Sequence, residues 1–200
     1  MMKIIKIHPR AYGSNGYLVI SGKQAIFIDP GSNAPEILRR IKESGALLTY
    51  IFLTHAHFDH MIALRAVLQA CQAPVCLHES EADFPGDPLK NASFLVFNEE
   101  SYPAPNRLLS DRERFSFGEE TLTVLHTPGH TQGSCCFLVG KHLFTGDTLF
   151  ADGVGRTDLF SGDDDRQAAS LEFLKTLPGD LVIHPGHGED EILSKALARI

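Results

Sequence analysis

The sequence predicts an α/β protein in which two β-sheets are sandwiched between outer helices. Strand-like and helix-like stretches alternate along the chain twice over, and residues that can bind metal follow several strands in tight turns. A length of 200 residues with 43% hydrophobic content provides enough apolar surface for one packed domain, which we expect to span residues 1–200. The pattern alone leaves open a single mixed sheet.

Short apolar runs between glycine turns predict the strands of the first half. We expect strands over residues 3–8, 17–20, 25–28, 47–53 and 74–78, and helices over 34–44, 61–70 and 79–84. The segment 85–111 contains four prolines in addition to Gly86 and is the least regular part of the chain. We expect it to form a loop over the site.

The second half repeats the alternation. We expect strands over residues 113–117, 121–125, 134–139, 141–145 and 180–184, and helices over 164–176 and 189–198. The acidic run Asp163-Asp-Asp165 resembles a metal site only superficially. Because carboxylates stabilise the positive end of a helix dipole, we expect this run to begin the helix instead.

Charge and composition favour a soluble enzyme that acts on a small molecule. The formal net charge is −7 and lysines and arginines form no cluster, so we expect no nucleic-acid partner. The chain has no apolar stretch suited to a signal peptide or a membrane span, so we expect a cytoplasmic protein without a membrane partner. Its four cysteines lack CxxC spacing, which favours free thiols. The oligomeric state stays open.

A cluster of metal-binding residue types follows the apolar run 47–53. Its sequence is Thr54-His-Ala-His-Phe-Asp-His. Residues two apart in an extended chain point to the same side, so the imidazoles of His55 and His57 can meet at one ion. Asp59 and His60 follow where the chain turns toward a helix, and they can serve a second ion. A lone Asp would be explained as a helix N-cap, but four ligand-type side chains in six positions favour metal.

Three later turns each carry one more ligand-type residue after a predicted strand. These residues are His130, Asp147 and His187. A glycine beside each of them lets the backbone fold close to a metal without a Cβ clash. With the first cluster they make five histidines and two aspartates, which is enough for two ions.

Seven motifs occur in order along the chain. They are Asn15-Gly-Tyr17, Asp29-Pro-Gly31, the cluster from His55 to His60, Thr127-Pro-Gly-His130-Thr-Gln-Gly133, Thr145-Gly-Asp147-Thr-Leu149, Gly155-Arg-Thr-Asp158 and Pro185-Gly-His187-Gly188. Each motif alone is a weak signal, but the ordered set covers nearly the whole chain. It resembles the metallo-β-lactamase superfamily, and within it the glyoxalase II-like (hydroxyacylglutathione hydrolase-like) thioesterases. The resemblance implies a four-layer αββα sandwich with the metals at one edge.

The resemblance also implies a ligand set. One metal would be held by His55, His57 and His130, and the other by Asp59, His60 and His187, with the Asp147 carboxylate bridging both. Two divalent ions are expected, zinc first, with iron or manganese as alternatives. Asp29 either orients a ligand imidazole or only forms the Asp-Pro-Gly turn. The other histidines match no ligand position and are expected to be structural or surface residues: His8, His78, His126, His142 and His184.

The implied reaction is thioester hydrolysis. Two divalent ions about 3.5–4 Å apart lower the pKa of a bridging water towards about 7 and so provide hydroxide at neutral pH. A thiolate, whose conjugate acid has a pKa of about 8.5, leaves without a strong general acid, so an acyl thioester such as S-lactoylglutathione is the expected substrate. Asp59 and Asp147 are the expected catalytic carboxylates. Arg156 is expected to bind the thiol carrier, or alternatively to pair with Asp158.

Typical glyoxalase II enzymes carry a helical domain after the last ligand, whereas only residues 188–200 follow His187, so no separate C-terminal glutathione-binding domain is expected.

Two alternatives remain beside the thioesterase. A persulfide dioxygenase with mononuclear iron on a triad of the type His55, His130 and Asp147 is one alternative. The other is a non-catalytic metal-binding module, which missing ligands would favour, but none is missing.

Overall fold

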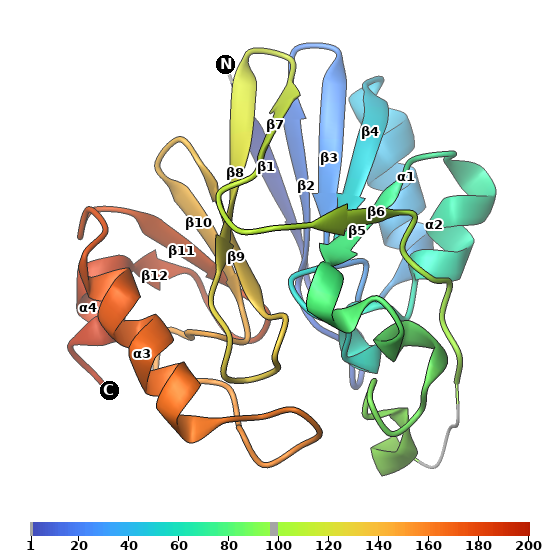
Figure 1. Ribbon diagram of the computed structural model, residues 1–200. Coiled ribbons are helices and arrows are strands. Elements are labelled where there is room, and N and C mark those ends of the chain that lie inside the picture. Colours follow the sequence, from blue (N-terminus) through green and yellow to red (C-terminus); the bar gives the residue numbers. More distant parts are fainter. Residues whose placement is uncertain (1, 97–99) are drawn as a thin grey trace.

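The computed structural model describes residues 2–96 and 100–200. Within these residues, two six-stranded sheets lie face to face, with α1 and α2 outside one sheet and α3 and α4 outside the other (Figure 1). The four-layer αββα sandwich predicted from the sequence is therefore confirmed, and a single mixed sheet is excluded. Among the described helices, none combines the length and apolarity needed to cross a bilayer.

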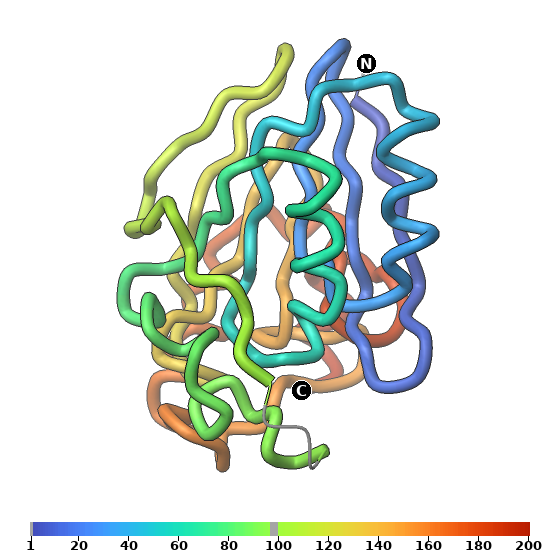
Figure 2. The backbone as a smooth tube through the Cα atoms, turned by 90° about the vertical axis from the view of Figure 1, so that its right-hand side faces the viewer, coloured from blue at the N-terminus to red at the C-terminus, as the bar shows by residue number. Residues whose placement is uncertain are grey.

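The first sheet is built from the first half of the chain, in the order β1-β2-β3-β4-β5-β6. Its strands are β1 (Lys3–Ile7), β2 (Gly16–Ser21), β3 (Gln24–Ile28), β4 (Leu47–Phe52), β5 (Val75–His78) and β6 (Arg107–Leu109). Strands β1 to β3 are antiparallel, and β3 to β6 run parallel. Figure 2 faces α1 (Ala34–Ser44) and α2 (Leu64–Ala70), which lie over this sheet.

The second sheet follows the order β12-β11-β10-β9-β8-β7. Its strands are β7 (Arg114–Phe117), β8 (Glu120–His126), β9 (Cys135–Val139), β10 (His142–Gly146), β11 (Val182–Pro185) and β12 (Glu191–Ile192), and its helices are α3 (Asp164–Lys175) and α4 (Leu193–Leu197). Only β10 and β11 pair in parallel, and α3 lies in the crossover between them. The side chain of Asp163 caps α3 by accepting from the Arg166 N–H, so the acidic run begins the helix as predicted.

Three apolar cores separate the four layers. Along β3, Phe27 belongs to the core beneath α1 and α2, whereas Ile26 and Ile28 belong to the core between the sheets. This alternation follows from the pleat of a strand, in which successive side chains point to opposite faces. It also separates the adjacent Cys135 and Cys136, which lie in the middle core and in the core under α3. All four cysteines are free thiols, as predicted.

Four predicted elements differ from the structure. In place of the helix expected over 79–84, the chain forms two 3-10 turns, Glu79–Glu81 and Phe84–Gly86. The expected loop 85–111 contains 3-10 turns at Phe84–Gly86 and Ser93–Val96 and the edge strand β6, while residues 97–99 lie outside the described part. Strand β6 is set by three parallel pairs with β5, a non-local contact that leaves no local signal. The helix expected over 189–198 is replaced by β12 and the shorter α4. The helix expected over 61–70 begins only at Leu64, because the 3-10 turn Phe58–His60 and a further turn precede it.

Candidate metal centre

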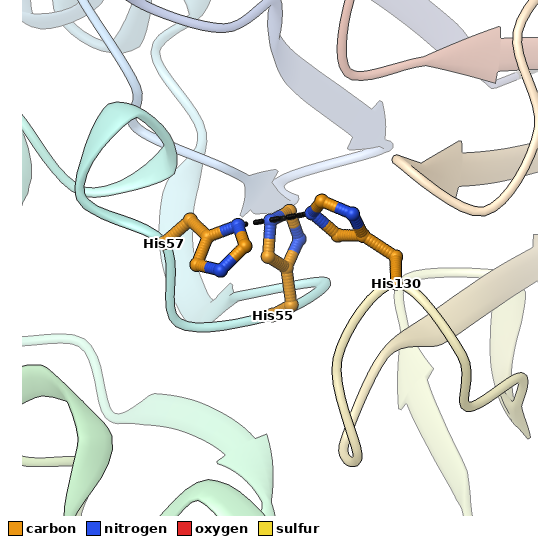
Figure 3. A group of neighbouring side chains, drawn as sticks. All are labelled: His55, His57 and His130. Atoms are coloured by element: carbon orange, nitrogen blue, oxygen red, sulfur yellow. Dashed lines mark hydrogen bonds between the residues drawn. The ribbon is translucent and has the colours of Figure 1, made fainter. Parts of the chain in front are cut away.

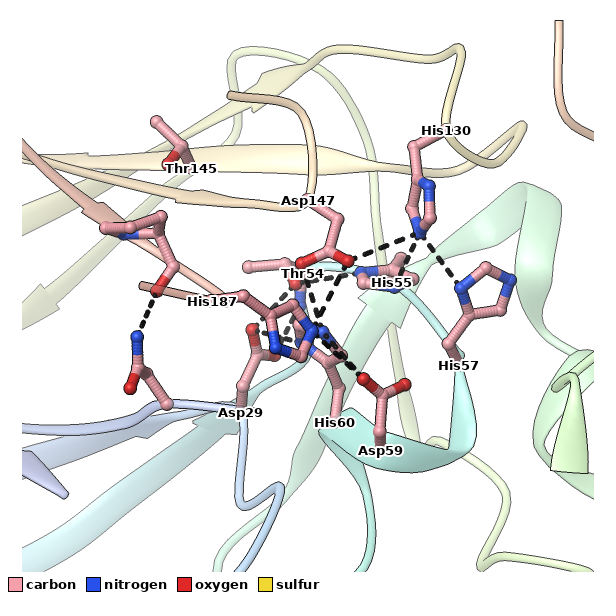
Figure 4. Close-up of polar contacts among 12 residues, drawn as sticks. Asp29, Thr54, His55, His57, Asp59, His60, His130, Thr145, Asp147 and His187 are labelled. Atoms are coloured by element: carbon pink, nitrogen blue, oxygen red, sulfur yellow. Dashed lines mark hydrogen bonds and ion pairs between the residues drawn. The ribbon is translucent and has the colours of Figure 1, made fainter. Parts of the chain in front are cut away.

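Turns from both sheets meet at one edge of the sandwich, and they carry all seven ligand-type residues singled out from the sequence (Figure 4). His55 and His57 directly follow β4, and Asp59 and His60 lie in the 3-10 turn Phe58–His60. His130 lies in the turn between β8 and β9, Asp147 follows β10, and His187 follows β11. Among the described residues, three overlapping groups could each hold a metal ion: His55, His57 and His130; His55, His60 and Asp147; and Asp59, His60 and His187.

The first group consists of three buried imidazoles whose ring nitrogens converge (Figure 3). Nε2 of His130 lies 2.9 Å from Nδ1 of His57 and 3.2 Å from Nε2 of His55. These nitrogens come from two sheets, because His55 and His57 follow β4 whereas His130 lies between β8 and β9.

The hydrogen bonds around this group fix where its protons are. Nδ1 of His130 lies 2.6 Å from the carbonyl oxygen of Arg156, which only accepts, so this nitrogen donates. The Thr54 hydroxyl donates its hydrogen to Asp29 Oδ2 at 2.7 Å, so Nδ1 of His55, 3.1 Å from that hydroxyl, must donate to it. In the neutral rings, Nε2 of His55 and Nε2 of His130 then face each other with lone pairs only. A shared cation satisfies both atoms, so these residues fit a metal ion.

The second group shows the same arrangement around His60. Nδ1 of His60 donates to Asp29 Oδ2 at 2.9 Å, which leaves the lone pair of the neutral ring on Nε2. That nitrogen lies 3.2 Å from Oδ1 of Asp147, yet both atoms are buried without a hydrogen-bond partner. Buried polar atoms are normally satisfied, so this unsatisfied pair also fits a cation between the two atoms.

Asp29 takes part in both of the roles considered for it. It lies in the turn before Gly31 with a left-handed φ of 51°. At the same time its carboxylate accepts from His60, from the Thr54 backbone N–H at 2.8 Å and from the Thr54 hydroxyl. These contacts orient the His60 ring, as the hydrogen-bond partners of metal-binding histidines do.

The Asp147 carboxylate lies between His60 on one side and His130 and His187 on the other. Its Oδ1 faces His60, while its Oδ2 lies 3.7 Å from Nε2 of His130 and 3.5 Å from Nε2 of His187. The backbone passes close by, because a Cβ at Gly186 would lie 2.2 Å from Asp147 Oδ1. The glycine before His187 is therefore required to leave room for this carboxylate.

Burial and mutual charge set the protonation of the site in the absence of metal. Burial lowers the pKa of His57 to about 3, and it also lowers the pKa values of His55 and His130. Burial would raise the pKa values of Asp59 and Asp147, but neighbouring imidazoles, His60 first, hold both pKa values below their usual range. Without metal, the site therefore presents ionised carboxylates and three neutral imidazoles. For His60 and His187, burial would lower the pKa values, but the neighbouring carboxylates outweigh it and raise them, so these two rings release a proton when they bind metal.

Glu81, which no sequence pattern indicated, is a fully buried carboxylate that joins two ligand-bearing turns. Its Oε2 accepts from the Ala56 N–H at 2.7 Å, and its Oε1 accepts from the Gly133 N–H at 2.9 Å. Ala56 lies between His55 and His57, and Gly133 is in the turn that carries His130. An acidic residue in a short predicted helix gives no sequence signal of this role.

Arg156 combines features of both roles considered for it, and its substrate-binding role stays a prediction. Its guanidinium makes a bidentate pair with Asp158, with distances of 2.6 and 2.7 Å, which is the alternative considered from the sequence. The side chain is 57% exposed, and Arg156 lines the cavity above the site. Its closest link to the metal centre is its backbone carbonyl, which accepts from His130.

A cavity of about 410 Å³ opens onto the site. At its floor lie His57, Asp59, His130, Asp147 and His187. Its remaining lining residues are Tyr12, Phe58, Ala92, Leu95, Val96, Phe150, Gly155, Arg156 and Leu159. Its size is in the range of small-molecule sites.

The fold and the site together define a metalloenzyme of the αββα class. The chain belongs to the metallo-β-lactamase superfamily, whose family model matches residues 9–187. It is 37% identical over 188 residues to the probable metallo-hydrolase YqgX of Bacillus subtilis (strain 168), covering 91% of this chain and 89% of that protein. The protein is therefore a metal-dependent hydrolase of this superfamily.

Other relatives point to several activities and metals. The hydroxyacylglutathione hydrolase of Tolumonas auensis is 34% identical over 173 residues, which cover 86% of this chain but 60% of that protein. The BLEG-1 B3 metallo-beta-lactamase superposes with a TM-score of 0.89 at 33% identity, over 99% of this chain and 97% of that one. TTHA1623 in a di-iron-bound form gives 0.86 at 34% identity, over 96% of each chain. ETHE1 from Myxococcus xanthus gives 0.80 at 28% identity, over 96% of this chain and 80% of that one.

Proposed function

We propose that the protein is a glyoxalase II-like thioesterase that hydrolyses a small-molecule acyl thioester at a two-metal centre, with zinc as the first candidate metal. In this proposal, His55, His57 and His130 hold one ion, and Asp59, His60 and His187 hold the other. Asp147 bridges them. The observation that supports two ions is the position of the Asp147 carboxylate, one oxygen of which faces His60 while the other faces His130 and His187.

When bound, two divalent ions make hydroxide available from water at neutral pH and polarise a substrate carbonyl. The chain's own residues hold and orient the reactants. Asp59 lines the cavity, and its Oδ2 lies 3.1 Å from Nε2 of His187. Its carboxylate orients the attacking water by accepting a hydrogen bond from it.

The reaction balances without a redox partner. Water releases one proton to solvent, its oxygen forms a bond to the acyl carbon, the carbon–sulfur bond breaks, and the sulfur leaves with the bonding electrons as a thiolate. The carboxylic acid product releases its proton, and the thiolate can take up a proton from solvent. A thiolate needs no strong acid for its departure, because a free thiol has a pKa of about 8.5. Burial keeps His55, His57 and His130 neutral, the carboxylates are ionised, and a raised pKa makes His60 a weak acid. A thioester therefore suits the site better than an amide does.

The test combines metal analysis with two assays on the purified protein. Metal content is measured by mass spectrometry, hydrolysis is followed with S-lactoylglutathione and further thioesters, and oxygen uptake is followed with glutathione persulfide. We expect two metals per chain, thioester cleavage and no oxygen uptake. One iron per chain with persulfide-dependent oxygen uptake would overturn the proposal.

That outcome would instead support the second candidate function, a persulfide dioxygenase. The observation that favours it is a triad of two histidines and one carboxylate around His130, whose Nε2 lies 3.2 Å from His55 Nε2 and 3.7 Å from Asp147 Oδ2. Such a set suits iron and dioxygen. The pairing of His60 with Asp147 through two unsatisfied buried atoms favours the two-metal thioesterase over it.

A further inference from the structure

The cavity above the metal centre is lined by apolar side chains from both halves of the chain. One wall consists of Tyr12, Phe58, Leu95 and Val96, from the first half of the chain, and the other includes Phe150 and Leu159, from the second half. Tyr12 is 76% exposed and Leu95 45% exposed, so large apolar surfaces face solvent beside the ligand-type residues. Exposed apolar surface around a pocket marks a place where an apolar group binds.

The same lining offers little to an anionic ligand. Among the described residues that line it, the one lysine or arginine is Arg156, and both Nε and Nη2 of that side chain are bound to the carboxylate of Asp158. A carrier with two carboxylates, such as glutathione, therefore finds no unpaired basic side chain among these described lining residues.

We infer that this site takes thioesters with an apolar acyl chain of several carbons in preference to thioesters of small hydroxy acids. The inference rests on the proposed thioesterase activity. With the carbonyl over the metal centre, the methylene groups of the acyl chain pack between the wall of Leu95 and Val96 and the wall of Phe150 and Leu159. A hydroxyl beside the carbonyl loses water against these walls and gains no partner there.

Burial of a methylene group predicts the size of the effect. A fully buried methylene is worth about fourfold in an equilibrium constant, and a partly buried one about twofold. The cavity is open to solvent through exposed Tyr12 and Leu95, so we expect kcat/KM to rise about threefold per added methylene. The rise ends when the chain extends beyond the walls.

The test uses the zinc-loaded full chain and neutral N-acetylcysteamine thioesters carrying acetyl, butanoyl, hexanoyl and octanoyl groups, with S-lactoylglutathione for comparison. We expect kcat/KM to increase along the series and to exceed that for S-lactoylglutathione by at least tenfold at octanoyl. A flat series, or S-lactoylglutathione as the best substrate, would overturn the inference while leaving the thioesterase intact.

A binding measurement separates this inference from the proposed activity. Calorimetry compares octanoate with lactate on the same protein, and we expect octanoate to bind at least tenfold more tightly. If octanoate binds in this way but no thioester is cleaved, the thioesterase proposal fails and the apolar site stands. Equal affinities for octanoate and lactate would overturn the apolar site.

Variants locate the effect in the walls. Leu95→Asn and Leu159→Asn are expected to reduce the gain per methylene to below twofold while two metals stay bound. The control is Leu47→Asn, because Leu47 is 68% exposed at the start of β4, whereas the ligand-bearing turn follows the end of that strand. It should keep the threefold gain. Wall variants with an unchanged gain would contradict the proposed acyl position.

Discussion

Oε2 of Glu81 accepts a 2.7 Å hydrogen bond from the backbone N–H of Ala56, between His55 and His57. Its other oxygen holds Gly133, in the turn that carries His130. A single buried carboxylate thus sets the spacing between a turn of the first sheet and a turn of the second. Burial raises the pKa of Glu81, and hydrogen bonds from Thr131, Gly133 and Ala56 act in the opposite direction.

Glu81→Gln is expected to weaken metal binding at the three-histidine group. Glutamine keeps the shape but turns one acceptor into a donor, which then faces an N–H group. We expect metal affinity to fall by about tenfold and the free energy of unfolding to fall by about 1–3 kcal/mol. Competitive zinc titration and urea denaturation measure these two quantities.

The matched control for this variant is Glu79→Gln, because Glu79 is exposed two residues away. It should change neither quantity. Wild-type zinc affinity in Glu81→Gln would show that the carboxylate does not set the position of the histidines.

Asp147→Ala is expected to abolish both metal occupancy and turnover. The substitution removes the carboxylate that faces both candidate metal groups and leaves His60 Nε2 opposite a cavity. Metal content of the dialysed protein and thioester hydrolysis are the measurements, with Asp152→Ala at an exposed position as the control. An active Asp147→Ala protein with two metals bound would show that the bridging role is misassigned.

Arg156→Ala is expected to leave the metal content unchanged, because Arg156 contacts His130 through its backbone carbonyl. We expect only the KM for thioesters of anionic thiols to rise. The rise should be about threefold, because an ion contact made by an exposed side chain contributes little binding energy. Gly155→Ala provides the contrast, since a Cβ there would lie 2.1 Å from the Asp147 carbonyl oxygen and 2.8 Å from His130 Nδ1. This variant should lose metal. Loss of metal in Arg156→Ala would mean that its side chain also supports the site.

Removal of metal is expected to make the protein sensitive to acid. Burial holds the pKa values of His55, His57 and His130 below 6.5, so below that pH the unfolded chain binds more protons than the folded chain. The free energy of unfolding therefore falls as pH drops, by up to about 1.4 kcal/mol per pH unit for each such histidine. For His57 the fall continues until about pH 3.

His60 acts in the opposite direction. Burial would lower its pKa, but Asp147, Asp29 and Asp59 outweigh burial and raise it. Protonated His60 contributes its full stabilisation of the folded state below pH 6.5. This contribution is lost only as the pH rises through the pKa that His60 has in the folded chain. Urea denaturation in chelator at pH 7 and pH 5 tests whether the three buried neutral histidines outweigh His60. Equal free energies of unfolding at the two pH values would contradict the predicted acid sensitivity.

The sequence predicted the layers because they depend on local patterns. The apolar run Ile26, Phe27 and Ile28 is visible along the chain, and so is the grouping of His55, His57 and His60 after one strand. Bringing His130 to within 3.2 Å of His55, 75 positions away, required the resemblance to a family, because spacing alone does not place distant turns together.

Features that depend on non-local contacts could not be predicted. Strand β6 exists because Arg107–Leu109 pairs with the edge of β5. Glu81 receives its role from Gly133, 52 positions away. Arg156 resembled a substrate-binding residue in its motif, but the motif does not show that its backbone carbonyl, rather than its guanidinium, faces the metal centre.

The distribution of ligand-type residues over two sheets affects how long the folded protein survives. His55 and His57 follow a strand of one sheet, whereas His130, Asp147 and His187 follow strands of the other. Ions held between them cross-link the halves of the sandwich, and a ligand that binds only the native state stabilises it in proportion to the logarithm of its concentration. We therefore expect the supply of metal to control proteolytic lifetime as well as activity, so that a metal-starved chain is degraded first.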